Sequence, residues 1–331
     1  MTDLSKGRIL VTGGAGFIGS ALIWGLNRQG LKDILVADFL RQDEKWKNLV
    51  PLQFADYIEA DDLLRGIERS RHLFDSVTTV FHLGACSSTT ETDSAYLIRN
   101  NFEYTKALAR FALEGDRRFV YASSAATYGS LEASLPETVA LEGLRPLNMY
   151  AYSKHLFDCY AQSAGILPRI TGVKYFNVFG PNENHKGTMR SVVHKAFHQI
   201  QETGCISLFK SYRPEFPDGG QLRDFMYVKD AVAATIFLAG HVSGDGLFNV
   251  GSGEAATWLA LANAVFSALA RDPRIEFIDM PETLRYKYQY YTRANIGKLR
   301  AAGFTQPITP LADAVSDYIR NYLVPGRQLG D

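Results

Sequence analysis

A tyrosine and a lysine stand four positions apart, at Tyr150 and Lys154, inside the stretch NMYAYSKHLFDCYAQ. The stretch has the composition of a helix, and side chains four positions apart share one helix face. A free phenol titrates at about 10, which is too high for a base at neutral pH. A neighbouring ammonium favours the phenolate and lowers that pKa. The pair therefore predicts an acid or base that works near neutrality, although such a pair without other motifs is usually a surface feature.

Two serines, Ser123 and Ser124, end the strand-like run in YASSAATYG. A hydroxyl at the carboxyl edge of a parallel strand faces the crevice in which such sheets bind ligands. There it can donate a hydrogen bond to a substrate oxygen whose charge changes during a reaction. A helix cap or a turn serine is the alternative, and it would be preferred if no cofactor motif stood upstream.

A further lysine, Lys186, lies in the loop GPNENHKGTM that follows the apolar run VKYFNVF. An apolar run needs a loop after it, but it does not need a lysine in that loop. Judged on loop composition alone, a solvated surface lysine is the preferred interpretation. A catalytic role would require burial in a closed cleft, which lowers the pKa of an ammonium.

The elements that position these residues alternate regularly in the first half of the chain. From Arg8 to about Phe179, β-branched runs (RILVTG, DILVAD, TTVFHLGA, RFVYASS and RITGVKYFNVF) are separated by helical segments. This alternation predicts an α/β fold, a Rossmann-type doubly wound parallel sheet covered on both faces. After residue 180 the pattern loosens into the helix-like MRSVVHKAFHQIQETG and short strand-like pieces such as FMYV and GLFNVG. We expect residues 1–180 to form mainly the nucleotide-binding domain and 181–331 mainly a smaller substrate-binding lobe, with some segments returning to the first domain.

A glycine motif, Gly14-x-Gly16-x-x-Gly19, follows the first strand and opens a helix. Glycines there allow a tight turn and let a pyrophosphate approach the backbone amides at the positive helix end. Asp38 ends the second run nineteen residues after Gly19, where an acid commonly meets the adenosine ribose. Dinucleotide binding is therefore the favoured interpretation, ahead of a turn that serves only packing.

The same region leaves the choice of nucleotide open. Asp38 by itself favours NAD, since a carboxylate repels a 2′-phosphate at close range. Arg41, Lys45 and Lys47 follow in the same loop and could supply compensating positive charge. A solvated charged loop is about equally compatible with these residues.

Composition excludes several classes of function. The chain has 331 residues, with 46% hydrophobic content and 35 basic against 35 acidic residues, so no global field attracts nucleic acid or an anionic membrane. Three dispersed cysteines without a CxxC pair are typical of reduced thiols and predict no metal site. Neither a signal peptide nor an apolar stretch of about 18 residues is evident, so we expect a cytoplasmic protein that binds a small molecule.

The chain resembles the extended short-chain dehydrogenase/reductase family, which includes the NAD-dependent epimerases and dehydratases. The features that carry the resemblance are, in order, the glycine loop, the acid after the second strand, the strand-end serine and Tyr-x-x-x-Lys. The resemblance covers nearly the whole chain, through GACSSTTETD, YASSAATYG, YAYSK, KYFNVFGPNENHKGTM, LRDFMYV, YKYQYYT and LRAAGF. The glycines specify only the superfamily, whereas GACSSTT and HKG point to one nucleotide-sugar epimerase within it.

This resemblance implies an isomerase that inverts C6 of the heptose in an ADP-sugar, with NADP as cofactor, for lipopolysaccharide core biosynthesis. The C6 hydroxyl would be oxidised to a ketone by hydride transfer to NADP, and the keto sugar would recover the hydride on its other face, so that net redox change is zero. Members of the family form homo-oligomers, often pentamers, which the resemblance extends to this chain.

The resemblance also assigns roles to residues. Tyr150 matches the first acid/base, Lys154 the lysine that anchors the cofactor, Ser124 the hydroxyl beside the substrate oxygen, and Lys186 the second acid/base. The cofactor would contact Gly13, Gly14, Gly16, Phe17, Ile18, Gly19, Asp38, Phe39, Lys45, Leu83, Gly84, Ala85, Cys86, Ser87, Asn100, Lys154 and Val178. The ADP-sugar would contact Ser124, Asn177, Lys186, Thr188, Lys195, Phe209, Lys210, Ser211, Tyr212, Arg223 and Tyr288.

Three positions depart from the family pattern. Phe39 replaces an asparagine, Ala60 stands where a lysine approaches the 2′-phosphate, and Lys195 stands where histidine occurs. They bear on NADP preference and on single substrate contacts, not on the reaction class. Two alternatives stay open: another nucleotide-sugar epimerase or dehydratase, such as a UDP-sugar 4-epimerase, and a non-catalytic dinucleotide sensor. The joint presence of Tyr150, Lys154 and Ser124 argues against the sensor.

Overall fold

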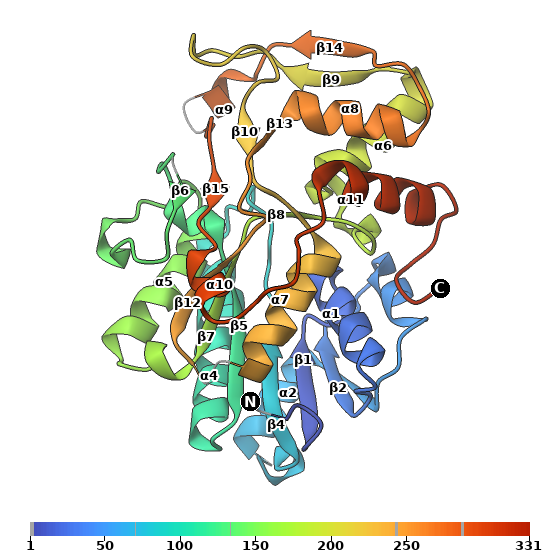
Figure 1. The fold of residues 1–331 in the computed structure, drawn as a ribbon. Coiled ribbons are helices and arrows are strands. Elements are labelled where there is room, and N and C mark those ends of the chain that lie inside the picture. The colour runs from blue at the N-terminus through green and yellow to red at the C-terminus, as the bar shows by residue number, and fades with distance from the viewer. Residues whose placement is uncertain (1–2, 70, 133, 242–243, 286–287) are drawn as a thin grey trace.

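A computed structural model describes residues 3–69, 71–132, 134–241, 244–285 and 288–331 of the chain. Its centre is a parallel sheet of seven strands in the order β12-β7-β5-β4-β1-β2-β3 (Figure 1). The strands are β1 (Arg8–Thr12), β2 (Ile34–Asp38), β3 (Asp56–Glu59), β4 (Val77–His82), β5 (Arg118–Ser124), β7 (Thr171–Tyr175) and β12 (Gly246–Val250). The order reverses between β1 and β4, and ligands bind at such a switch point. The predicted Rossmann-type fold is confirmed.

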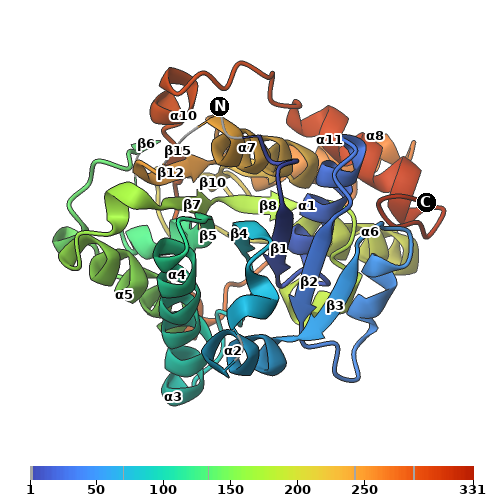
Figure 2. The ribbon, with the colours of Figure 1, turned by 90° about the horizontal axis from the view of Figure 1, so that it is seen from below.

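Helices cover both faces of the sheet, as Figure 2 shows. One face carries α1 (Phe17–Arg28) and α7 (Val228–His241), and the other carries α2 (Ala60–Arg69), α4 (Tyr104–Glu114) and α5 (Met149–Ser163). Successive residues of β1 divide between the two layers: Ile9 and Val11 pack in one apolar core, and Leu10 packs in the other. Because both faces are covered, β1, β2, β4, β5 and β7 are largely apolar runs, which is why they were recognisable in the sequence. The edge strand β3, DYIE, is partly exposed and was not predicted.

The run RITGVKYFNVF, predicted as one strand, is two. After β7 the chain leaves the sheet at Phe176, and β8 (Asn177–Phe179) pairs in parallel with β11 (Phe225–Tyr227). The Phe176 amide donates to Val250 O at 3.1 Å, while the Asn177 amide donates to Asp224 O at 3.2 Å. The change of hydrogen-bonding partner redirects the chain across the carboxyl edge of the sheet.

Residues beyond 180 contribute to both parts of the molecule. Above the sheet in Figure 1 lie α6 (Val192–Thr203), α8 (Trp258–Ala268), β9 (Ile206–Phe209), β14 (Ile275–Ile278), β10 (Leu222–Arg223), β13 (Ala256–Thr257) and α11 (Leu311–Tyr318). GLFNV, by contrast, is the edge strand β12, and α7 packs on α1 and the sheet. The division into two domains stays a prediction, with β12 and α7 as the segments that return to the sheet.

Shorter elements complete the fold. They are α3 (Ser94–Leu97), α9 (Glu282–Arg285), α10 (Gly297–Ala301), β6 (Ser134–Leu135), β15 (Arg293–Ala294), the 3-10 segments Glu44–Leu49, Arg71–Phe74, Ala125–Tyr128, Leu141–Gly143, Leu167–Arg169 and Asn184–Met189, and the π-helical turns Ile98–Glu103 and Ile319–Leu323. All three cysteines are free thiols. Within the described part of the chain, no helix has the length and apolar character that crossing a membrane requires.

Candidate active site

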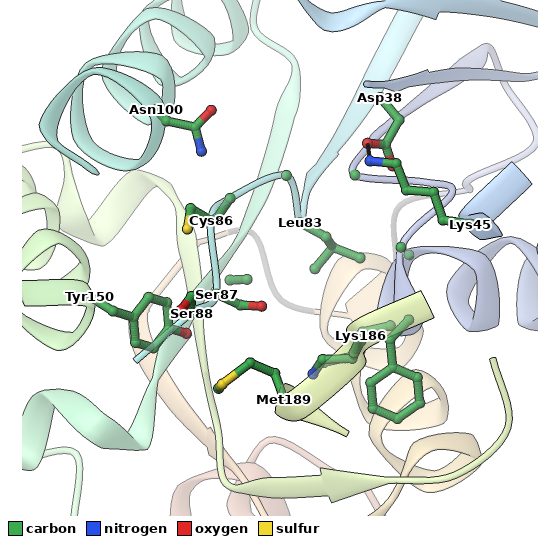
Figure 3. Close-up of a pocket in the computed structure, with 18 of the residues that line it drawn as sticks. Asp38, Lys45, Leu83, Cys86, Ser87, Ser88, Asn100, Tyr150, Lys186 and Met189 are labelled. Carbon is green, nitrogen blue, oxygen red and sulfur yellow. Dashed lines mark hydrogen bonds and ion pairs between the residues drawn. The ribbon is translucent and has the colours of Figure 1, made fainter. Parts of the chain in front are cut away.

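A cavity of about 520 Å³ opens at the carboxyl ends of the central strands (Figure 3). Its size is ordinary for a small-molecule site. Every predicted cofactor-binding residue except Gly14 lines it, and so do all four predicted catalytic residues. These lining residues are Gly13, Gly16, Phe17, Ile18, Gly19, Asp38, Phe39, Lys45, Leu83, Gly84, Ala85, Cys86, Ser87, Asn100, Ser124, Tyr150, Lys154, Val178 and Lys186.

The glycine loop shapes one wall of the cavity. Gly13 has φ +69°, and a side chain there would come 2.6 Å from the Gly84 amide nitrogen, so the loops after β1 and β4 lie in contact only because Gly13 is a glycine. A side chain at Gly19 would overlap the Gly13 carbonyl oxygen. Gly14 instead faces the core, where a Cβ atom would lie 2.8 Å from Val36 Cγ1. The lack of a side chain at Gly14 allows β1, α1 and β2 to pack closely.

The amino end of α1 fits a pyrophosphate. Gly16 is the N-cap residue and has no side chain to cap the helix, and the first turn carries no acidic residue. The first amides of a helix lack partners within the helix and carry the positive end of its dipole. Because Gly16, Phe17 and Ile18 line the cavity, these amides are placed to bind phosphate oxygens of a dinucleotide.

Asp38 is engaged by the protein itself. Its carboxylate accepts hydrogen bonds from the amides of Ala15 at 2.9 Å and Phe39 at 2.7 Å. Lys45 Nζ lies 2.9 Å from Asp38 Oδ1, and Figure 3 marks this ion pair. The carboxylate therefore secures the glycine loop and is neutralised by Lys45. Arg41 lies against Phe39, with the Arg41 guanidinium 5.4 Å from the centre of the Phe39 ring.

Tyr150 and Lys154 share one face of α5, and the cap of this helix fixes where they lie. Asn148 Oδ1 accepts from the Ala151 amide at 2.8 Å, which begins the helix just before Tyr150. Burial raises the pKa of Tyr150 above 10.0, opposed by its hydrogen bond with Ser124. The predicted lowering of this pKa by Lys154 is therefore wrong for the protein alone, because the cost of burying a phenolate dominates.

Lys154 is itself strongly perturbed. Its side chain is buried, and burial lowers its pKa to about 8, opposed by the nearby Asp158 carboxylate and Cys86 thiol. An ammonium held this close to neutrality can change charge within the working pH range.

Lys186 enters the cavity from the side opposite Tyr150 (Figure 3). It lies on the 3-10 segment Asn184–Met189, where Gly187 has φ +54°. Its ammonium lies 5.2 Å from the centre of the Phe17 ring. Burial lowers the pKa of Lys186, helped by the positive charge of Lys195 and opposed by Glu183. Lys186 is thus no solvated loop lysine, and it meets the condition of burial that a catalytic role requires.

Two buried side chains that the sequence reading missed hold the Lys186 turn. Asn48 donates to Ala15 O at 2.9 Å and to Asn182 O at 3.1 Å, which joins this turn to the glycine loop. The Glu183 carboxylate accepts from the Ser191 hydroxyl at 2.6 Å and closes the turn from its other end. Asn48 lies in no stretch singled out in the sequence, whereas Glu183 lies within GPNENHKGTM but was given no role there.

The predicted substrate residues form two groups. Ser124 and Lys186 line the cavity with the cofactor residues, whereas the other nine are not among its lining residues: Asn177, Thr188, Lys195, Phe209, Lys210, Ser211, Tyr212, Arg223 and Tyr288. Several of the nine meet in the upper lobe. The Arg223 guanidinium lies 5.0 Å from the centre of the Tyr288 ring, and Phe209 packs edge-on against the same ring. Their contact with a substrate stays a prediction.

Other lining residues were not among the predicted binding or catalytic residues. They are Arg41, Asp43, Ala60, Ser88, Tyr96, Tyr104, Ala122, Ser123, Tyr175, Phe176, His185 and Met189. Arg41, Ala60 and Ser123 had been singled out in the sequence, and Ser88, His185 and Met189 lie within identified motifs, which was an available signal for them. Tyr96, Tyr104 and Tyr175 carry no local signal, since only the fold brings them to this edge.

Comparisons with known proteins agree with this geometry. The sequence profile of the NAD dependent epimerase/dehydratase family matches residues 9–251. The ADP-L-glycero-D-manno-heptose-6-epimerase of Nitratidesulfovibrio vulgaris is 51% identical over 95% of this chain and 97% of its own.

Solved structures give the same family. The crystal structure of ADP-L-glycero-D-manno-heptose-6-epimerase from Helicobacter pylori has a TM-score of 0.81 at 26% identity and covers 97% of this chain and 98% of its own. UDP-glucose 4-epimerase of Thermus thermophilus, in complex with NAD, has a TM-score of 0.74 at 26% identity and covers 94% of this chain and 97% of its own. The expected family is confirmed: the chain is an enzyme of the NAD dependent epimerase/dehydratase family.

Proposed function

We propose that this protein is an ADP-glyceromanno-heptose 6-epimerase of lipopolysaccharide core biosynthesis. It interconverts ADP-D-glycero-β-D-manno-heptose and ADP-L-glycero-β-D-manno-heptose. The observation that carries the proposal is the placement of Tyr150 and Lys186, which enter one cavity from opposite sides. Inversion of a single carbon presents its oxygen in two orientations, so acid/base groups at two positions are useful. The relative from Nitratidesulfovibrio vulgaris supports the choice of substrate.

The two groups have complementary protonation states. Burial raises the pKa of Tyr150, which is therefore a protonated acid at neutral pH. Burial lowers the pKa of Lys186, which makes its neutral amine accessible as a base. A bound nicotinamide would supply a reversible hydride acceptor, which allows the hydride of C6 to return to the opposite face of that carbon. For one epimer Lys186 accepts the C6 hydroxyl proton and Tyr150 donates on return, and for the other epimer the roles exchange. Proton exchange with solvent restores the starting state.

Ser124 and Lys154 support these transfers. The Ser124 hydroxyl, which accepts from the Ala126 amide at 3.1 Å, donates to the substrate oxygen as it becomes a carbonyl. With the cofactor bound, the Lys154 ammonium would hold its ribose and would stabilise negative charge on the Tyr150 oxygen.

We propose NADP as the resident nucleotide. Its support is the Asp38–Lys45 ion pair, which removes the repulsion that a bare carboxylate exerts on a 2′-phosphate, and Arg41 in the same cavity wall. Denaturing the purified protein and identifying the released nucleotide tests this assignment. We expect NADP, because a cofactor regenerated in every turnover need not leave. Recovery of NAD alone would overturn it.

Stereochemical analysis at C6 after incubation with ADP-D-glycero-β-D-manno-heptose tests the function. The likeness to a UDP-glucose 4-epimerase structure makes UDP-glucose the appropriate competing substrate. We expect inversion of the ADP-sugar and no conversion of UDP-glucose. The reverse result would favour a 4-epimerase, and no conversion of either would favour a sensor. A cytoplasmic homo-oligomer, such as a pentamer, completes the proposal, and light scattering measures its state.

A further inference from the structure

A buried ion pair lies directly beneath the catalytic groups. Lys174 belongs to the central strand β7 and Asp158 to α5, and their side chains are 1% and 0% exposed. Lys174 Nζ lies 2.7 Å from Asp158 Oδ2. None of the reaction steps proposed above uses either residue.

Stability alone does not explain this pair. Removing two charges from water is costly, and apolar residues of similar volume are often as stabilising as a buried ion pair or more so. What the pair holds in place is therefore the informative question.

On the sheet side, the pair encloses the peptide that carries Ser124. The Ser123 hydroxyl donates to Asp158 Oδ2 at 2.8 Å. Beyond Ser124, Lys174 donates to the Thr127 hydroxyl at 2.6 Å, and that hydroxyl donates to Ser124 O at 2.7 Å. The strand end is thus held just before and just after Ser124.

On the helix side, Asp158 stands one turn beyond Lys154 and two turns beyond Tyr150 on α5. Tyr121 of β5 donates to Asp158 Oδ1 at 2.8 Å, a second link between this helix and the strand of Ser124. The carboxylate also raises the pKa of Lys154 against the effect of burial. Further titratable groups near Lys154 are Tyr150 on the same face of α5, and the Cys86 thiol and His82 from the β4 side.

We infer that Asp158 and Lys174 are positioning residues for the epimerisation: their pair fixes Ser124 relative to Tyr150 and Lys154 and keeps Lys154 charged. The inference rests on the proposed function for its kinetic readout. According to this inference, both core residues support catalysis by holding other residues in place, without touching the substrate.

The first test is the double variant Asp158→Asn/Lys174→Met, which removes both charges together and leaves neither partner buried alone. We expect a folded protein whose kcat falls at least tenfold while KM for the ADP-sugar changes little. Activity requires the Lys154 ammonium and is lost as pH rises through its pKa. The Asp158 carboxylate raises that pKa, so its removal moves the alkaline limb of the pH profile to lower pH.

A second variant separates geometry from charge. Thr127→Val removes the hydroxyl between Lys174 and Ser124 O at nearly constant volume. We expect it to lower kcat several-fold and to leave the alkaline limb at the pH of the parent. It also decides the matter if the double variant does not fold, because parental kcat in Thr127→Val would refute the positioning of Ser124.

The control is Lys229→Met/Asp317→Asn, which removes a part-exposed ion pair of the same 2.7 Å length whose residues do not line the cavity. We expect this control to have the kcat of the parent and an alkaline limb at the same pH as the parent. A folded Asp158→Asn/Lys174→Met variant with parental kcat and limb would overturn the inference.

Failure of the proposed function would look different. If the parent protein does not epimerise the ADP-sugar, the pH dependence of NADPH binding, followed by nicotinamide fluorescence, still reports the charge of Lys154. The inference then requires that binding weakens at a lower pH in Asp158→Asn/Lys174→Met than in the parent. An unchanged midpoint would refute it.

Discussion

Lys45 Nζ lies 2.9 Å from the Asp38 carboxylate, and both side chains are largely buried in the cavity wall. The pair places a cation where a nucleotide-binding fold usually presents only an acid. A 2′-phosphate here would meet Lys45 first, whereas a 2′-hydroxyl would still find the acceptors of Asp38. We therefore expect the same two residues to influence both the shape of the glycine loop and the choice of nucleotide.

Lys45→Ala should weaken binding of NADP more than that of NAD. The variant removes a charge-assisted contact and also exposes the Asp38 carboxylate to the phosphate, at a cost of about 1 to 2 kcal/mol. Fluorescence titration with NADPH and NADH measures the difference. Lys47→Ala is the control, because Lys47 pairs with Glu44 on the surface at 2.7 Å. Equal weakening of both nucleotides by Lys45→Ala would show that Lys45 only supports the loop.

Tyr150→Phe should leave the cofactor bound and remove most turnover. It deletes the hydroxyl and keeps the ring, and general acid/base groups contribute roughly 10² to 10⁴ in rate. Tyr152→Phe is a matched control on the same helix, since the Tyr152 side chain is 44% exposed. Epimerisation rate and bound nucleotide are measured for both variants. Near-parental turnover in Tyr150→Phe would reduce the Tyr/Lys motif to a structural feature.

Lys154→Met should stabilise the cofactor-free protein at neutral pH while abolishing turnover. Burial lowers the pKa of Lys154 to about 8, so the unfolded state holds the proton more tightly than the folded state. The penalty is full below pH 8 and declines between pH 8 and 10.5, the ordinary value. At 1.36 kcal/mol per unit it amounts to about 3 kcal/mol at pH 7.

Urea denaturation at pH 7 and pH 9.5 checks this sign. The advantage of Lys154→Met over the parent should be larger at pH 7. An advantage that is absent at pH 7, or that grows toward pH 9.5, would contradict the burial of a charged lysine.

The sequence predicted those residues of the site that are recognisable from their spacing along the chain. Four-residue spacing on a helix identified Tyr150 and Lys154, and a serine at a strand end identified Ser124. The predicted direction of the Tyr150 pKa shift was wrong, because that direction depends on burial, which the tertiary structure determines. Lys186 was found through the resemblance, since loop composition alone favoured a surface lysine.

Those parts of the fold that leave a local pattern in the sequence were predictable, and those that depend on distant contacts were not. Strands buried on both faces are apolar runs, so the sheet was evident, but the break at Phe176 depends on a hydrogen bond to Val250. Asn48 and the Asp158–Lys174 pair were missed because their partners are distant in sequence. Gly14 was assigned to the cofactor by motif, yet its absent side chain makes room for Val36.

Lys186→Met is the variant on which the two-base mechanism depends most. It keeps an unbranched apolar stem beside the Phe17 ring, 5.2 Å from the ammonium in the parent, and removes only the amine. We expect epimerisation to fall by a factor comparable to that of Tyr150→Phe, whereas a surface lysine would change stability by no more than about 0.5 kcal/mol. Each single variant should still transfer hydride to or from one epimeric configuration, because each retains one acid/base group. An aldehyde analogue of the ADP-sugar measures this, since its disproportionation to alcohol and acid reports hydride transfer without inversion. Parental epimerisation by Lys186→Met would leave Tyr150 as the sole acid/base group and make Lys186 a binding residue.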